Sequence, residues 1–224
     1  SPQLDALLNG FHADFIKKQN LQVPRKREYH GRIRQLKDPT ASAEWKRFEQ
    51  TLALFRKYGE KYHFDPLMLA AQGYQESQLR QDAKSAVGAV GVMQLMPATG
   101  AELKVGDIKI LEPNIHAGAK YMDQLMTRYF PDAKFDEANR SLFAFAAYNA
   151  GPGRIAQLRQ EAEKRGLNPD KWFNNVEIVA AERVGIETTT YVRNIFKYYA
   201  AYKLSLEVLE AQKKARESLT PGKS

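Results

Sequence analysis

An apolar run that starts at a helix-initiation signal and ends near a carboxylate constrains the fold of this chain most. Asp65 precedes Pro66; an Asp side chain can accept free N–H groups of a first turn, and Pro loses no hydrogen bond there. All residues from Leu67 to Ala71 are apolar, which predicts a helix covered on most of its surface. We expect this helix to begin at about Pro66 and to bring Glu76 to the end of a buried element.

Glu76 is the first candidate for chemistry. A carboxylate on an apolar helix carries a desolvation penalty, so it either pairs with a cation or has a raised pKa and keeps its proton. A proton held near neutral pH would make Glu76 a general acid. The alternative is a solvated or ion-paired glutamate, which is the usual state of this residue type.

A glycine-containing loop follows the helix. Gly88 and Gly91 bracket a turn ahead of Met93 and Gln94, and glycine lets a main chain approach a ligand closely because it has no Cβ. The spacing matches neither the phosphate-loop nor the dinucleotide-binding pattern. The loop is therefore either part of a binding site or only a turn.

The remaining segments have helical periodicity, with apolar residues every three to four positions. The predicted helices are 4–18, 44–62, 114–129, 136–148, 155–165 (polar and exposed), 176–183 and 191–216. No segment alternates convincingly as a strand does, and there is room for one small hairpin at 105–110. The sequence predicts a mainly α fold.

Three regions follow from this pattern: an N-terminal helical segment and linker at 1–43, a main domain at 44–205, and a helix end and tail at 206–224. The helix at 4–18 is amphipathic and needs a partner surface. Taken by itself, region 1–43 is an N-terminal helical extension that packs on the main domain.

Charge and composition narrow the function classes. The 34 basic and 26 acidic residues give a net charge of +8, which favours polyanionic surroundings such as nucleic acid, anionic lipid or the bacterial cell wall. Nucleic acid is not an expected partner, because the known nucleic-acid-binding motifs are absent. With no cysteine and four scattered histidines, we expect no disulfide, metal site or cofactor.

No membrane span is expected in this chain, because its longest apolar run, 142–148, is far below the roughly twenty residues that a bilayer requires. The sequence begins at Ser1 without a signal peptide. If the protein is exported, the targeting segment has been removed or lies upstream.

Several segments together resemble a known family. Glu76-Ser77, Ser85, GAVGVMQLMP at 88–97, AYNAG at 147–151 and Tyr191 have the order and approximate spacing of the lytic transglycosylases of the soluble, lysozyme-like class. The resemblance covers about residues 53 to 204. WFNNVE at 172–177 and ETTTYVRNIFKYYAAYKL at 187–204 look most like the membrane-bound F subgroup, in which a solute-binding-protein-like module precedes the catalytic one.

The resemblance implies a lysozyme-like helical catalytic domain at 44–205 that acts on peptidoglycan without a cofactor. It also implies a monomeric periplasmic protein, with outer-membrane association through parts missing from this chain and a possible regulatory module upstream. Region 1–43 would then be the end of that solute-binding module, and the alternative is the helical extension that packs on the main domain. Its reaction would be non-hydrolytic cleavage of the β-1,4 bond between N-acetylmuramic acid (MurNAc) and N-acetylglucosamine (GlcNAc), leaving 1,6-anhydro-MurNAc ends.

Glu76 would be the sole acid and base of this reaction. Glycosidases ordinarily use two carboxylates, but the sequence has no second acid in a motif near Glu76, and Asp82 lies in a polar stretch typical of a surface. The resemblance implies that Glu76 protonates the leaving oxygen and then deprotonates the sugar 6-hydroxyl. The substrate acetamido group would replace the missing carboxylate.

Substrate contacts are expected from the loop after the helix. Ser85 would hydrogen-bond Glu76 or the acetamido group, or it only caps its loop. Met93 and Gln94 resemble a sugar-contact pair, with the thioether on a ring face and the amide on hydroxyls. As an isolated residue, Met93 would more often belong to the core.

Three further residues complete the expected site. Tyr148 and Asn149 would frame the cleft, although Asn149 could only cap the helix before it. Tyr191 would donate a hydrogen bond to Glu76 or to the substrate, or it begins an aromatic core stripe.

Two other functions stay open. A goose-type lysozyme-like hydrolase would share the fold and the glutamate but admit water. A non-catalytic glycan-binding module would keep the aromatic cleft and should have lost the acid.

Overall fold

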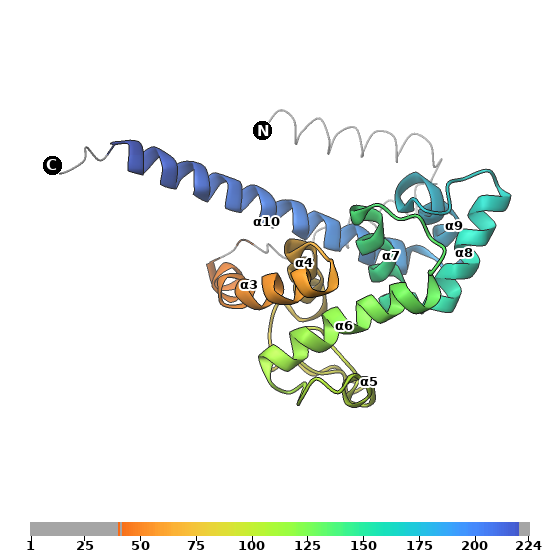
Figure 1. The fold of residues 1–224 in the computed structure, drawn as a ribbon, viewed down its shortest axis with the longest axis horizontal. Helices are drawn as coiled ribbons and strands as arrows, with labels where there is room; N and C mark the ends of the chain where they lie inside the picture. The colour runs from red at the N-terminus through yellow and green to blue at the C-terminus, as the bar shows by residue number, and fades with distance from the viewer. Residues whose placement is uncertain (1–39, 41, 220–224) are drawn as a thin grey trace, which may run out of the picture. The chain divides into compact units, whose positions relative to one another are not determined.

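The computed structural model describes residue 40 and residues 42–219 (Figure 1). They belong to the larger of two units into which the chain divides, residues 38–224. The predicted helix at 4–18 and almost all of the predicted linker lie outside the described residues. The helices are α3 (Ser42–Tyr62), α4 (Pro66–Ser77), α5 (Pro97–Leu103), α6 (Leu111–Tyr129), α7 (Glu137–Ala150), α8 (Pro152–Lys164), the π-type turn η1 (Trp172–Val176), α9 (Glu177–Arg183) and α10 (Ile186–Leu219).

The mainly α prediction is confirmed, since the described part of the chain contains helices and no strand beyond isolated bridges. The bridges join Lys84 to Val90 and Val90 to Leu95. The small hairpin for which the sequence left room at 105–110 is not formed; these described residues make turns. There Lys104 and Gly106 have φ values of 52° and 107°, which turn the chain between α5 and α6 instead of extending it.

Helix α4 lies at the centre of the domain, between α3 and α10 (Figure 1). Its predicted start is confirmed: Asp65 caps the helix by accepting a hydrogen bond from the Leu67 N–H at 2.7 Å, and Pro66 occupies the first turn. All residues from 68 to 74 are buried. The ring of Phe48 on α3 stacks on the ring of Tyr202 on α10, with 4.0 Å between the ring centroids. This contact joins the two helices that flank α4.

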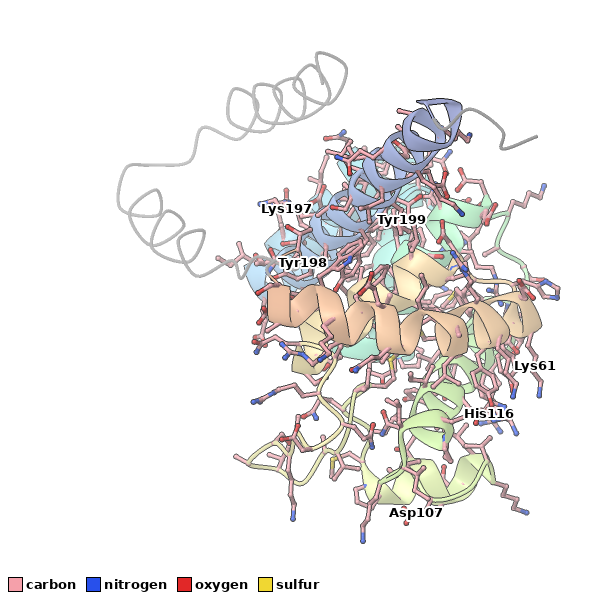
Figure 2. The ribbon with its side chains drawn as sticks, turned by 90° about the vertical axis from the view of Figure 1, so that its left-hand side faces the viewer. Lys61, Asp107, His116, Lys197, Tyr198 and Tyr199 are labelled. Carbon is pink, nitrogen blue, oxygen red and sulfur yellow. The ribbon has the colours of Figure 1, made fainter. Side chains whose placement is uncertain are left out.

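The turn that leads into α4 is held by α6 and α7. His116 on α6 stacks on the Tyr58 ring at 4.3 Å and hydrogen-bonds the Tyr62 hydroxyl at 2.8 Å. Figure 2 labels His116 on α6 and Lys61 near the end of α3, where the chain turns toward α4. Arg140 of α7 donates to the carbonyls of Tyr62 and His63 at 3.1 and 3.0 Å. These contacts anchor the chain just before the central helix.

Two other sequence expectations need correction. The exposed helix predicted at 155–165 begins earlier, at Pro152, and buries Ile155, Leu158 and Ala162; their spacing forms one narrow apolar stripe on a polar helix. Helix α5 was not predicted, because seven residues are too few to show a helical period. No helix among the described residues has the length and apolarity to cross a membrane.

Candidate active site

Glu76 lies at the last turn of α4, where the predicted desolvation takes effect. The side chain is partly exposed, and burial raises its pKa from 4.5 to about 7, while a hydrogen bond from Tyr191 acts in the opposite direction. The negative pole of a helix dipole at this end also disfavours a carboxylate. Glu76 can therefore hold a proton near neutral pH.

Tyr191 reaches Glu76 from α10. Its hydroxyl donates to Glu76 Oε1 at 2.5 Å, and the residue is 9% exposed. Gln72, one turn before Glu76 on α4, points its Nε2 at the Tyr191 hydroxyl at 3.5 Å. The Gln72 Oε1 atom is buried without a hydrogen-bond partner among the described residues. The Tyr191 ring and the glutamine thus enclose one side of the carboxyl group.

Among the described residues, no charged group contributes to the pKa shift of the Glu76 carboxyl group. Burial and the Tyr191 hydrogen bond are the two causes of its shift. Asp82, the nearest acid in sequence, is exposed. Within residues 42–219, no group of three or more His, Cys, Asp or Glu residues could hold a metal ion.

The loop after α4 is fixed against the helix that carries Glu76. Ser77 Oγ donates to the Val92 carbonyl at 2.9 Å and to the Gly73 carbonyl at 3.2 Å. A Cβ on Gly73 would lie 2.9 Å from Val92 Cγ1, so only glycine permits this close approach. The loop therefore rests directly on α4.

Asn114, buried on α6, holds the same loop from the other side. Its Oδ1 accepts from the Met93 N–H at 2.8 Å, while its Nδ2 donates to the carbonyls of Val90 and Ile108 at 3.0 and 2.8 Å. Gly91 has a φ of 78°, and a Cβ there would lie 2.2 Å from Asn114 Nδ2. A single amide side chain thus fixes three backbone groups.

Tyr148, at the end of α7, lines the site beside Glu76. Its hydroxyl donates to the Met93 carbonyl at 2.7 Å, and its ring meets Tyr121 edge-on at 5.3 Å. Burial, and then the charge of Glu76, raise the pKa of Tyr148 well above its ordinary value. Tyr148 therefore stays protonated and ties the loop to the end of α7, near enough to Glu76 for the charge of that residue to affect its pKa.

The other residues singled out in the loop make contacts within the protein. Met93 is fully buried and its side chain packs on Gly118, so the thioether lies in the core, the alternative that the sequence left open. Ser85 Oγ accepts from the Ala89 N–H at 3.0 Å, which is the loop-capping alternative. Gln94 Nε2 donates to the Gly91 carbonyl at 2.9 Å.

Asn149 is exposed at the end of α7 and is joined to α10. Its Oδ1 accepts from Thr188 Oγ1 at 2.9 Å. Thr188 lies one helical turn before Tyr191, so this bond ties the segment that carries Tyr148 and Asn149 to the helix that carries Tyr191.

Sequence reasoning missed Gln72, Asn114 and Thr188. Gln72 and Asn114 are polar residues within otherwise apolar helical faces, and both are fully buried. A buried polar residue on a core stripe needs a partner, so this mismatch was the available signal. Their partners lie far away in the sequence and could not be deduced.

The Transglycosylase SLT domain family model matches residues 53–171. A membrane-bound lytic murein transglycosylase F of Haemophilus influenzae is 33% identical over 188 residues, which cover 77% of this chain and 39% of that protein. One from Pseudomonas fluorescens is 30% identical over 87% of this chain and 44% of its own length.

A solved structure supports the same relationship. An inactive glutamate-to-glutamine variant of the lytic transglycosylase Slt of Pseudomonas aeruginosa has a TM-score of 0.54 and 28% identity, over 69% of this chain and 24% of that chain. The predicted lysozyme-like fold is therefore confirmed. This chain spans about two fifths of the length of the curated relatives given above.

Replacing Asn114 by Ala should loosen the loop. Three backbone groups lose their partner, and each buried unsatisfied group costs about 1–3 kcal/mol, so we expect unfolding free energy to fall by roughly 2–5 kcal/mol after partial solvation. Urea denaturation measures this. Gln124→Ala on the same helix is the control, and an equal, small effect of both substitutions would contradict the role of Asn114.

Replacing Glu76 by Gln should stabilise the protein at alkaline pH. The folded-state pKa of about 7 lies above the ordinary 4.5, so stability from the bound proton is complete below pH 4.5 and is lost as pH rises through 7. This difference in pKa corresponds to at most roughly 3 to 4 kcal/mol, and the partial exposure of the side chain reduces it.

Denaturation of both proteins between pH 4 and 9 tests this expectation. Glu76→Gln should lack the decline that the parent protein shows, whereas Glu102→Gln, at an exposed position on α5, should retain it. A constant difference between Glu76→Gln and the parent protein at all pH values would mean that the carboxyl group is not desolvated.

Proposed function

Because the chain belongs to the Transglycosylase SLT domain family, we propose that it is a peptidoglycan lytic transglycosylase whose sole acid and base is Glu76. One observation carries the proposal: a carboxyl group with a pKa of about 7 receives a hydrogen bond from the neutral Tyr191 hydroxyl and, within the part of the chain that the structure describes, from no cation. The reaction is cleavage of the MurNAc-β-1,4-GlcNAc bond without water.

In the first step, protonated Glu76 gives its proton to the glycosidic oxygen. The bond from that oxygen to the MurNAc anomeric carbon breaks, and the GlcNAc end leaves as an alcohol. The carbonyl oxygen of the neighbouring 2-acetamido group bonds to the anomeric carbon and takes up the positive charge. The substrate thereby supplies the nucleophile that a second carboxylate supplies in most glycosidases.

In the second step, ionised Glu76 removes the proton from the 6-hydroxyl of the same sugar. That oxygen attacks the anomeric carbon and displaces the acetamido oxygen, which becomes a neutral amide again. The product is a 1,6-anhydro ring, and Glu76 ends protonated as it began. Both proton transfers use one group whose pKa lies near the working pH.

Tyr191 stabilises the charged state between these steps. Its hydroxyl donates to the Glu76 carboxylate at 2.5 Å, and a hydrogen bond to an ionised group is stronger than one to a neutral group. Because Tyr191 is neutral, it supports the carboxylate without lowering its pKa as far as a cation would.

The other expected site residues act by binding and positioning. Tyr148 and the exposed Asn149 frame the cleft. The Ser85 hydroxyl accepts from Ala89 and can donate its own proton to the sugar, while Gln94, whose Nε2 donates to the Ala83 and Gly91 carbonyls, offers its Oε1. Met93 acts through its backbone, since its carbonyl accepts from Tyr148 at 2.7 Å while its side chain lies in the core.

The relatives support this assignment. The Haemophilus influenzae protein is a murein transglycosylase by name, and the Pseudomonas aeruginosa structure is that of an inactive variant in which a glutamate is replaced by glutamine. The net charge of +8 suits the acidic bacterial cell wall. We place the activity in the periplasm, where peptidoglycan is exposed to such an enzyme.

The products test the reaction. Purified peptidoglycan incubated with this chain should yield fragments lighter by one water than those of a hydrolase, as measured by chromatography and mass spectrometry. Glu76→Gln should lower the rate about 10²- to 10⁴-fold, the usual contribution of general acid–base catalysis, while Glu102→Gln should not. Reducing sugar ends would identify a hydrolase, and no turnover by the parent chain would identify a binding module.

Replacing Tyr191 by Phe should move the pH profile. The rate of the parent protein should fall above pH 7 as Glu76 loses its proton, and removing the hydroxyl that lowers the Glu76 pKa should shift this limb to higher pH. We also expect turnover about 10- to 100-fold slower, from loss of a hydrogen bond to a charged group. Tyr129→Phe, at an exposed position, is the control. If Tyr191→Phe changed neither the alkaline side of the pH profile nor the rate, Tyr191 would have a purely structural role.

A further inference from the structure

A cavity of about 400 Å³ lies between α8 and α9, apart from the carboxyl group of Glu76. Its volume falls within the range of roughly 300–1,000 Å³ of small-molecule sites. The lining residues are Arg154, Gln157, Leu158, Glu161 and Arg183. They offer two guanidinium groups, one amide, one carboxylate and an apolar floor.

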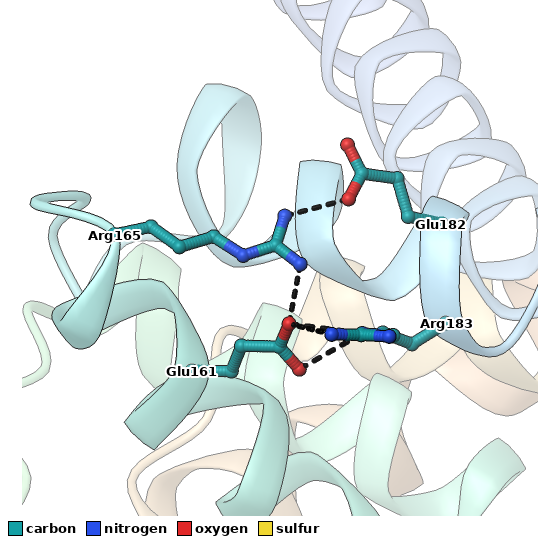
Figure 3. Close-up of polar contacts among 4 residues, drawn as sticks. All are labelled: Glu161, Arg165, Glu182 and Arg183. Carbon is teal, nitrogen blue, oxygen red and sulfur yellow. Dashed lines mark hydrogen bonds and ion pairs between the residues drawn. The ribbon is translucent and has the colours of Figure 1, made fainter.

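The carboxylate in this wall is already engaged (Figure 3). Glu161 accepts from Arg183 Nη2 at 2.7 Å and from Arg183 Nε at 2.9 Å, and it also pairs with Arg165. Arg165 in turn donates to Glu182 Oε2 at 2.6 Å. These four residues form a chain of ion pairs, from Arg183 through Glu161 and Arg165 to Glu182, with no net charge.

Arg154 stands outside that network and gives the cavity its positive charge. Its one hydrogen bond runs from Nη2 to the Arg183 carbonyl at 3.5 Å, and no carboxylate pairs with it within the described part of the chain. An arginine has five N–H donors in a planar fork that matches a carboxylate. Most of the donors of Arg154 remain available to a ligand.

The cavity adjoins the ends of the helices that build the catalytic site. Helix α7 ends just after Asn149, α8 starts two residues later, and Arg154 lies in its first turn. Helix α9 ends at Arg183 and α10 starts at Ile186. The bond between Thr188 and Asn149 joins the two pairs of helices at this point, one helical turn before Tyr191.

We propose that this cavity binds a carboxylate of the peptide that the glycan substrate carries on its muramic acid residues, with Arg154 as the anchor. The inference rests on the proposed function for the identity of the substrate. The Gln157 amide can hydrogen-bond the peptide backbone, and Leu158 contacts its apolar parts. The single uncompensated positive charge fits a monoanionic group better than a phosphate.

Paired substrates test the cavity. Glycan strands with their peptides, and the same strands after amidase removal of the peptides, are compared by kcat/KM for the parent chain and for Arg154→Gln. We expect the ratio between the two substrates to fall about 3- to 10-fold in Arg154→Gln, chiefly through KM on the peptide-bearing strands. Lys164→Gln, at an exposed position on the same helix outside the cavity, should leave the ratio unchanged.

A ratio that is the same in Arg154→Gln and the parent chain would overturn the proposal. Titration of the parent chain and Arg154→Gln with N-acetylmuramyl tripeptide supplies a reading that does not need turnover. Weaker binding by Arg154→Gln supports the cavity, and equal binding refutes it. Failure of the parent chain to cleave either strand refutes the proposed function, which this binding measurement distinguishes from failure of the cavity.

Discussion

The hydrogen bond from Tyr191 to Glu76 is the contact on which the site depends, because it joins α10 to α4 at the carboxyl group whose pKa burial raises to about 7. A cation in the same place would stabilise the carboxylate and remove the proton that the chemistry requires. A purely apolar neighbour would leave no support for the carboxylate after proton transfer. A neutral hydroxyl meets both demands, so the packing of α10 on α4 is also what sets the acidity of the site.

The second constraint is the loop at 88–97, which is held by polar contacts and not by regular structure. Ser77 binds it from α4, Asn114 from α6 and Tyr148 from α7. Since buried polar groups are costly when unpaired, these bonds specify one arrangement of the loop. The glycines at 73 and 91 are required because the partner side chains approach where a Cβ would stand.

The sequence predicted those features that have local causes. The start of α4 follows from Asp65 and Pro66, and the raised pKa of Glu76 follows from the apolar helix before it. The sequence could not predict the directions of side chains within the loop, because they depend on tertiary packing. Met93, for example, faces the core because Gly118 on α6 leaves room for its side chain. The role of Asn114 could not be predicted for the same reason, since its three backbone partners lie six to twenty-four residues away in the sequence.

In the proposed mechanism, reliance on a single acid also changes what the rest of the protein must provide. When the substrate supplies both the nucleophilic acetamido oxygen and the attacking hydroxyl, the protein needs to hold one sugar in a fixed geometry and to exclude water. Effective molarities in such intramolecular steps can be very large, so holding the strand on either side of the scissile bond contributes directly to rate. If the flanking peptide binds as proposed where α7, α8, α9 and α10 converge beside Tyr191, its contacts there would help to fix the position of the reacting sugar and so contribute to catalysis.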